Sequence, residues 1–137
     1  MNKVLIIGAS GLLGRSLVEF FVSNNFQVGA LSRNCDNQND KFNNYSVDVL
    51  DYGHLEFVVA QYDIVVNCIG QITNPIHECV SLNTKGVKNI IDAVKKNGNY
   101  LIHLSTVSVY GSSSTVTEES PVNPESVYGS LKYFAEY

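Results

Sequence analysis

Short apolar runs rich in branched residues alternate along the chain with longer runs whose apolar residues recur at helical spacing. Runs of the first kind predict buried strands, and runs of the second kind predict amphipathic helices. We expect strands at 3–7, 27–31, 45–49, 63–68 and 100–104. We expect helices from Leu13 to the Asn24-Asn25 pair, at 54–61, from Val87 to the Asn97-Gly98 pair, and from Val127 onward. The polar stretch 32–44 is the most loop-like part of the chain.

The expected strands are apolar on both faces, which is typical of a parallel sheet covered by helices on both sides. Right-handed crossovers between successive strands then favour a Rossmann-type, doubly wound α/β fold. The sequence shows no internal repeat and no linker, so residues 1–137 are expected to form one domain. A flavodoxin-like or response-regulator domain shares this alternation, but the end of the third strand lacks a phosphoacceptor aspartate in the expected setting.

Composition narrows the class of protein. The 137 residues are 45% hydrophobic and 16% charged, as in globular domains. The net charge is −4 and the basic residues are scattered, so we expect no nucleic-acid partner. Apolar runs stay short of membrane-spanning length, and we expect no membrane partner. Cys35, Cys68 and Cys79 have neither disulfide-framework nor zinc-binding spacing, so we expect no metal and a reducing, cytoplasmic location.

A glycine-rich turn joins the first expected strand to the first expected helix. Gly8, Gly11 and Gly14 have the spacing Gly-x-x-Gly-x-x-Gly. Glycines let the backbone turn sharply and let a pyrophosphate approach, while the helix N-terminus supplies unpaired N–H groups and the positive end of its dipole. The turn therefore predicts a dinucleotide-phosphate site. A glycine-rich turn of some other α/β protein is the alternative interpretation.

The end of the second expected strand bears on the choice of cofactor. NAD-binding enzymes usually place a carboxylate there, about 20 residues after the glycines, to bind the ribose 2′-hydroxyl. Here Ser32 and Arg33 occupy that place, and no carboxylate lies between Gln27 and Asp36. A hydroxyl followed by a guanidinium suits a 2′-phosphate, which favours NADP as the cofactor and leaves NAD as the second choice. An ordinary solvated arginine is the alternative interpretation of Arg33.

Tyr128 and Lys132 lie four residues apart at the start of the last expected helix, so both side chains point to one side. A nearby ammonium stabilises a phenolate, which suits the pair to proton exchange between an alcohol and a ketone. The fifth expected strand ends in the hydroxyls of Ser105 and Thr106, where open α/β sheets bind ligands. A hydroxyl at that place can bind a substrate oxygen. Taken alone, these groups could be a surface pair and capping residues.

Together these motifs resemble the extended short-chain dehydrogenase/reductase superfamily, whose NAD(P)-dependent epimerases, dehydratases and reductases act mainly on nucleotide sugars. The resemblance covers essentially the whole chain. It implies that Tyr128 is the general acid/base, that Lys132 lowers the pKa of Tyr128 and binds the nicotinamide ribose, and that Thr106 orients the substrate oxygen. It also implies further cofactor contacts from the glycine turn, the strand ends and one helix asparagine: Gly8, Ser10, Gly11, Leu12, Leu13, Gly14, Ser32, Arg33, Asp48, Val49, Cys68, Ile69, Gly70 and Asn83.

Two departures from the family pattern matter. Val107 and Ser108 follow Thr106, where nucleotide-sugar 4,6-dehydratases have an Asp-Glu pair, so dehydration is not expected. The chain is also shorter than family members and stops at Tyr137, inside the helix that carries Lys132, so the substrate-binding part is expected to be absent from it. We therefore expect an exposed sheet edge, and self-association or low stability of the isolated chain.

The hypothesis that results is an NAD(P)-dependent oxidoreductase or epimerase that acts on a nucleotide sugar or a similar alcohol or ketone. Its expected partner is that small-molecule substrate, and a homodimer is left open. The alternative is a module of the same fold that binds a nucleotide or another protein without catalysis. Intact Thr106, Tyr128 and Lys132 favour the enzyme, because a binding module needs none of them. The three histidines have no partner motif, and we expect structural roles for them.

Overall fold

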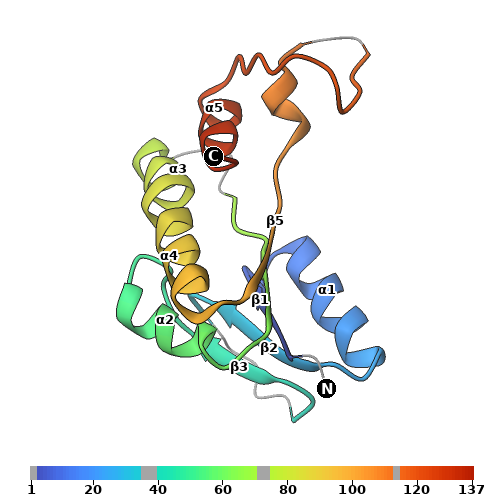
Figure 1. Ribbon diagram of the computed structural model, residues 1–137, viewed down its shortest axis with the longest axis vertical. Helices are drawn as coiled ribbons and strands as arrows, with labels where there is room; N and C mark the ends of the chain where they lie inside the picture. Colours follow the sequence, from blue (N-terminus) through green and yellow to red (C-terminus); the bar gives the residue numbers. More distant parts are fainter. Residues whose placement is uncertain (1–2, 35–39, 71–74, 113–114) are drawn as a thin grey trace.

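The computed structural model describes residues 3–34, 40–70, 75–112 and 115–137, so Cys35 and part of the expected loop lie outside the described residues. The strands form one parallel sheet in the order β3-β2-β1-β4-β5 (Figure 1). This arrangement confirms the predicted doubly wound α/β fold. The strands are β1 (Lys3–Ile7), β2 (Gln27–Ser32), β3 (Asn43–Ser46), β4 (Ile64–Asn67) and β5 (Tyr100–His103).

Helices connect the strands and cover both faces of the sheet. α1 (Leu12–Ser23) lies against one face, and α2 (Tyr52–Val59) and α4 (Val87–Asn97) lie against the other (Figure 1). The other helical segments are α3 (Ile76–Ser81), a π-helical turn (Leu82–Gly86), a 3₁₀ turn (Val107–Tyr110) and α5 (Val127–Phe134). Because α3, the π-helical turn and α4 follow one another directly, the helix expected to start at Val87 is preceded by further helical turns.

The alternation of side chains along β1 divides the core into two layers. Val4 and Ile6 pack toward α1, whereas Leu5 and Ile7 pack toward α2 and α4. All of these side chains are fully buried, because β1 is the central strand and has helices over both faces. Burying one such side chain contributes about 1.5–3 kcal/mol, so β1 holds the two layers together.

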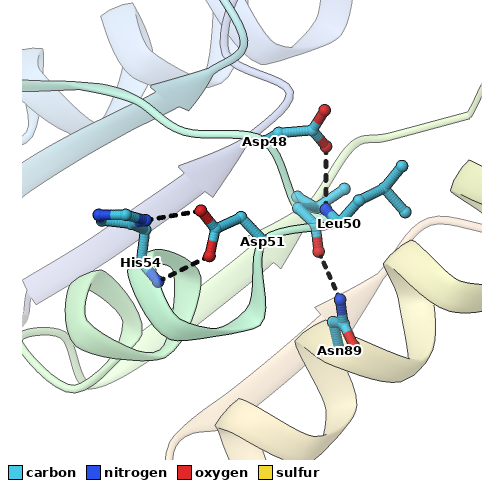
Figure 2. A network of polar contacts seen from close by, with 6 residues as sticks. Asp48, Leu50, Asp51, His54 and Asn89 are labelled. Carbon is cyan, nitrogen blue, oxygen red and sulfur yellow. Dashed lines mark hydrogen bonds and ion pairs between the residues drawn. The ribbon is translucent and has the colours of Figure 1, made fainter.

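The third strand was predicted too late in the chain. β3 covers Asn43–Ser46 and does not reach Val49. Beyond it, the Asp48 carboxylate accepts a hydrogen bond from the Leu50 N–H (2.9 Å), which turns the chain away from the sheet (Figure 2). The Val49 carbonyl accepts a hydrogen bond from Asn89 Nδ2 (2.8 Å), which ties this turn to α4. The apolar residues at 47 and 49 therefore belong to a turn and not to a strand, and within this turn Val49 is buried.

The helix that follows begins earlier than predicted. The Asp51 carboxylate accepts a hydrogen bond from the His54 N–H (3.3 Å), so it caps α2, and the first helical residue is Tyr52 (Figure 2). The same carboxylate lies 2.6 Å from His54 Nδ1. The expected end near Gln61 is also shifted, because α2 ends at Val59. A side-chain cap fixes this boundary, and the apolar periodicity alone did not show it.

The order of strands reverses direction at β1, because the chain first adds β2 and β3 on one side and then β4 and β5 on the other. In open α/β sheets, ligands bind outside the carboxyl ends of the strands at such a reversal. α5 lies beyond that end of the sheet in Figure 1. Among the helices of the described ranges, none combines the length and the apolar character needed to cross a membrane.

Candidate active site

The glycine turn lies at the carboxyl end of β1, next to the reversal in strand order. Gly14, within α1, lies directly against this turn. A Cβ on Gly14 would come within 2.2 Å of the Gly8 carbonyl oxygen and 2.8 Å of the Ala9 Cα. Real side chains do not approach backbone atoms so closely, so only glycine lets α1 start this near to the strand end.

The N-terminus of α1 opens toward the same side. Its N-cap residue is Gly11, which has no side chain with which to cap the helix. The first N–H groups of a helix have no intrahelical acceptor, and the helix dipole adds positive potential there. This combination suits the binding of an anion such as a phosphate.

The end of β4 forms the opposite wall. A Cβ on Gly8 would lie 3.2 Å from the Cys68 carbonyl carbon and 3.3 Å from the Ile69 nitrogen, so the ends of β1 and β4 are in contact. The Asn67 side-chain oxygen accepts a hydrogen bond from the Ile69 N–H (3.0 Å) and fixes the turn after β4. Burial raises the pKa of the Cys68 thiol to about 11, so Cys68 is uncharged at neutral pH.

An open cavity of about 290 Å³ lies over these strand ends. Most of the residues predicted to contact the cofactor line it: Gly8, Ser10, Gly11, Ser32, Arg33, Val49, Cys68, Ile69 and Gly70. Three lining residues were not predicted, namely Leu31, Val47 and Leu82. Leu31 lies near the end of β2 and Val47 directly follows β3, so their places beside strand ends were a usable signal. Leu82 had none, because it opens a π-helical turn that the sequence did not reveal.

Other predicted cofactor residues do not line this cavity. Leu12 and Leu13 are 91% and 48% exposed on α1. Gly14 packs against the glycine turn, and the Asp48 carboxylate is engaged by the Leu50 N–H. Asn83 is buried in the π-helical turn, where its amide donates to the Cys79 carbonyl (2.8 Å). Short π-helical turns are frequent at functional sites. Here the Asn83 amide forms a hydrogen bond within its own helical segment.

Arg33 lines the cavity at the end of β2, but its guanidinium has a protein partner. Nη1 lies 3.7 Å from Oε2 of Glu78, which belongs to α3. Both side chains are about half exposed. Ser32 is buried, and its hydroxyl donates to the Asn34 carbonyl (3.0 Å). The sequence did not identify Glu78, because it lies far along the chain from Arg33 and meets it only in the fold.

Thr106 caps the 3₁₀ turn after β5. Its hydroxyl oxygen accepts a hydrogen bond from the Ser108 N–H (3.2 Å), and its hydroxyl donates to the Ser108 side chain (3.2 Å). This turn supports α5, because a Cβ on Gly129 would come within 2.5 Å of the Ser108 carbonyl oxygen. Ser105 lies beside Thr106 but donates to the Glu136 carboxylate. The two hydroxyls therefore have different partners.

Tyr128, in the first turn of α5, lies beside a residue that lines the cavity. A Cβ on Gly70 would lie 3.1 Å from the Tyr128 hydroxyl oxygen, and Gly70 is one of the lining residues. The pKa of Tyr128 is raised, first by burial and second by the nearby thiol of Cys79. The role of Lys132 toward Tyr128 stays a prediction, and in this structure the Lys132 amine lies against a different group.

The partner of Lys132 is a histidine of β5. Lys132 is 1% exposed, and its Nζ lies 3.4 Å from His103 Nε2. Burial lowers the pKa of Lys132, while the nearby Glu136 and Cys68 act in the opposite direction. His103 therefore has a polar partner that its sequence context did not show. In the described part of the chain, no group of three His, Cys, Asp or Glu side chains could hold a metal ion.

Curated relatives match the chain over nearly its full length. It is 32% identical to the N-acetyl-alpha-D-glucosaminyl-diphospho-ditrans,octacis-undecaprenol 4-epimerase of Escherichia coli O157:H7, over 98% of this chain and 42% of that protein. It is 28% identical to methionine adenosyltransferase 2 subunit beta of Bos taurus, over 98% of this chain and 42% of that protein. The chain thus spans less than half the length of these two relatives.

Solved structures show the same fold. The Bordetella bronchiseptica enzyme WbmG in complex with NAD superimposes with a TM-score of 0.86 and 23% identity, over 98% of this chain and 47% of that one. The sequence profile of the NAD dependent epimerase/dehydratase family matches residues 4–137. Because this match covers almost every residue, the chain belongs to the NAD dependent epimerase/dehydratase family.

Proposed function

We propose that residues 1–137 form the NAD(P)-binding domain of an oxidoreductase or epimerase that acts on a nucleotide-linked sugar or a similar alcohol or ketone. The observation that carries the proposal is the Tyr128 hydroxyl, which lies beside Gly70 at the cavity of the glycine turn. A group able to transfer a proton thus lies next to a site suited to a dinucleotide. The E. coli relative is an epimerase by name, which agrees with this chemistry.

The residues around the cavity fit a dinucleotide. The pyrophosphate would bind at the α1 N-terminus, beside Ser10 and Gly11, because backbone N–H groups are offered there. The adenosine would lie toward the ends of β2 and β3, where Leu31, Val47 and Val49 provide an apolar wall. A 2′-phosphate would meet Arg33, so NADP is the preferred cofactor and NAD the second choice. The NAD in the WbmG complex supports the general class.

The proposed chemistry is hydride transfer coupled to proton transfer. The bound nicotinamide supplies the hydride acceptor or donor. The Tyr128 phenolate takes the proton of the substrate hydroxyl while the carbon loses its hydride, and the phenol returns the proton in the reverse direction. Thr106 orients the substrate oxygen, and Lys132 stabilises the phenolate and binds the nicotinamide ribose. Each of these roles rests on the family resemblance and on the position of Tyr128.

Cofactor titration tests this proposal. Purified chain is titrated with NADPH and with NADH, and binding is followed by the fluorescence of the reduced nicotinamide. We expect tighter binding of NADPH, and we expect this preference to disappear in Arg33→Ala. A preference for NADH would contradict the role of Arg33 and leave the dinucleotide site in place. Binding of neither cofactor by a folded chain would contradict the dinucleotide site itself.

A second function is supported by one comparison. The Bos taurus relative is, by name, the beta subunit of methionine adenosyltransferase 2. This name supports a second candidate function, in which the domain binds another protein and does not itself catalyse a reaction. For a non-catalytic module, Tyr128→Phe would change nothing but local packing. For the proposed enzyme, Tyr128→Phe in the protein that contains this chain would abolish turnover and retain cofactor binding. Measuring both properties in the same variant separates the two functions.

A further inference from the structure

A chain of three polar side chains connects the ends of β4 and β5 to α5. Asn67 and His103 are paired residues of the two strands, and Asn67 Nδ2 lies 3.0 Å from His103 Nδ1. His103 Nε2 lies 3.4 Å from Lys132 Nζ. Asn67 and Lys132 are 0% and 1% exposed, so water cannot replace these contacts easily.

The backbone fixes the direction of the Asn67 amide. The Ile69 N–H donates to the Asn67 side-chain oxygen at 3.0 Å. A peptide N–H can only donate, so this oxygen must face Ile69 and the amide nitrogen must face His103. Rotating the amide by half a turn would place the Asn67 amide N–H group against the Ile69 N–H, which is two donors against each other. The orientation therefore follows from the hydrogen-bonding rules alone.

The direction of the amide then fixes the tautomer of His103. Because Asn67 Nδ2 donates, His103 Nδ1 must accept, and it carries no proton. The ring proton of the neutral imidazole is thus on Nε2. A doubly protonated ring would turn an N–H toward the amide donor. Burial is the largest cause that lowers the pKa of His103 to about 4, which agrees with a neutral ring.

The tautomer of His103 decides whether Lys132 donates or accepts the hydrogen bond between them. His103 Nε2–H is a donor, so Lys132 Nζ must be the acceptor at this contact. An ammonium group has three donors and no lone pair, whereas a neutral amine has one lone pair. The charged and titratable groups that act on Lys132 are His103 of β5, Cys68 after β4 and Glu136 after α5. Burial opposes the charge of Lys132 and outweighs the opposite effects of Glu136 and Cys68.

We propose that His103, with its tautomer fixed by Asn67, is a positioning residue that holds Lys132 as an uncharged hydrogen-bond acceptor. The importance of this contact for catalysis rests on the proposed function. Lys132 stabilises the Tyr128 phenolate only as a cation, so the Tyr128–Lys132 pair becomes active when Lys132 leaves His103 and gains a proton from solvent. The Tyr128–Lys132 pair is thus inactive while Lys132 is bound to His103, and it is active once Lys132 has left His103 and is charged.

Nuclear magnetic resonance on the chain without any ligand tests the proposal. The ¹⁵N signals of His103 report the tautomer, and the ¹³Cε signals of labelled lysines report each pKa, with Lys132 assigned from Lys132→Arg. We expect an unprotonated Nδ1 and a protonated Nε2 in His103, and a lower titration midpoint for Lys132 than for the other lysines. A proton on Nδ1, or a Lys132 midpoint equal to those of the exposed lysines, would overturn the proposal.

Two variants test whether Asn67 sets the tautomer of His103 and whether His103 in turn lowers the titration midpoint of Lys132. In Asn67→Asp, a carboxylate accepts from both Ile69 and His103, so the ring proton should move to Nδ1 and the Lys132 midpoint should rise. In His103→Gln, the amide can turn its oxygen toward Lys132, and the midpoint should rise without an added charge. His103→Asn is the matched control, because it can keep the Asn67 contact but does not reach Lys132. An unchanged midpoint in His103→Gln would contradict the role of His103. These measurements use no cofactor, so their failure is distinct from failure of the proposed function.

Discussion

The Tyr128 hydroxyl lies so close to Gly70 that a Cβ on Gly70 would come within 3.1 Å of it. Gly70 ends the described turn after β4, and Tyr128 belongs to the first turn of α5. The two residues are far apart in the sequence, and the phenol occupies the space that a side chain on Gly70 would need. This contact joins the group proposed to transfer protons to the wall of the nucleotide cavity.

The contact predicts the effect of Gly70→Ala. The added methyl group would push the Tyr128 hydroxyl aside by a few tenths of an ångström, since the 3.1 Å separation is tighter than an ordinary van der Waals contact. A misplacement of 1 Å can cost about 100-fold in rate. The shift expected here is smaller than 1 Å, so we expect kcat to fall by less than about 100-fold, with little change in stability. Steady-state kinetics measures the change in kcat, and thermal unfolding measures the change in stability. Unchanged kcat in a folded variant would argue against a role for Tyr128 at this position.

Gly14→Ala tests the packing of the glycine turn. The new Cβ would overlap the Gly8 carbonyl oxygen at 2.2 Å, and backbone atoms cannot move aside as a flexible side chain can. We expect the free energy of unfolding to fall by about 1–3 kcal/mol, as for other overpacked sites, and cofactor binding to be lost. Gly53→Ala is the matched control in α2, where the nearest atom to the new Cβ is 3.8 Å away. It should be neutral or stabilising by up to about 1 kcal/mol in urea unfolding.

The fold was predictable where both faces of a strand are buried. β1 has an unbroken apolar run because helices cover both of its faces, and the sequence pattern gave its bounds correctly. β3 lies at the sheet edge and is mostly polar, so the apolar residues after it gave a false position for the strand. Its pairing with β2 places Asn44 opposite Ala30, which is a property of the fold and not of the local sequence.

The site was predictable where one segment carries the whole motif. The glycine turn and the residues at the ends of β2 and β4 follow directly from the strand pattern, and most of them line the cavity. The position of Lys132 depends on His103 and Asn67, and these three residues belong to three different elements, α5, β5 and β4. No spacing rule connects these residues, so the sequence predicted an ammonium beside Tyr128 and missed its contact with His103.

The lowered pKa of His103 predicts a pH dependence of stability. The folded pKa of about 4 lies below the usual value of 6.5, so between these values the unfolded chain binds more protons than the folded chain. The stabilisation is therefore complete above about pH 6.5 and is lost as the pH falls toward 4. For a half-buried ring we expect about 1–2 kcal/mol after allowing for solvent screening. Urea unfolding at a series of pH values measures this loss, and His103→Gln should remove most of it.

The Arg33–Glu78 pair predicts a variant that binds NADPH more tightly. Glu78 holds the Arg33 guanidinium at 3.7 Å and adds a negative charge near the proposed 2′-phosphate position. An exposed pair is worth about 0.2–1 kcal/mol, so Glu78→Gln should tighten NADPH binding by up to about fivefold and leave NADH binding nearly unchanged. Glu56→Gln removes the same charge from a separate pair with Lys96 and is the matched control. Equal effects of the two variants would mean that only the net charge of the chain matters.

The exposed edge of the sheet predicts self-association of the isolated chain. β5 is the last strand of the sheet next to β4, and it carries two apolar side chains toward solvent, Tyr100 at 69% and Ile102 at 41% exposure. A strand edge with unpaired peptide groups and apolar side chains can pair with a second chain. Ile102→Lys should shift the sedimentation profile toward monomer, because edge lysines oppose such pairing. Phe57→Lys, which replaces a 71% exposed apolar side chain on α2, is the control that should not cause this shift. A chain that is monomeric before any substitution would contradict the prediction, and an equal response to both variants would assign the association to general surface hydrophobicity and not to β5.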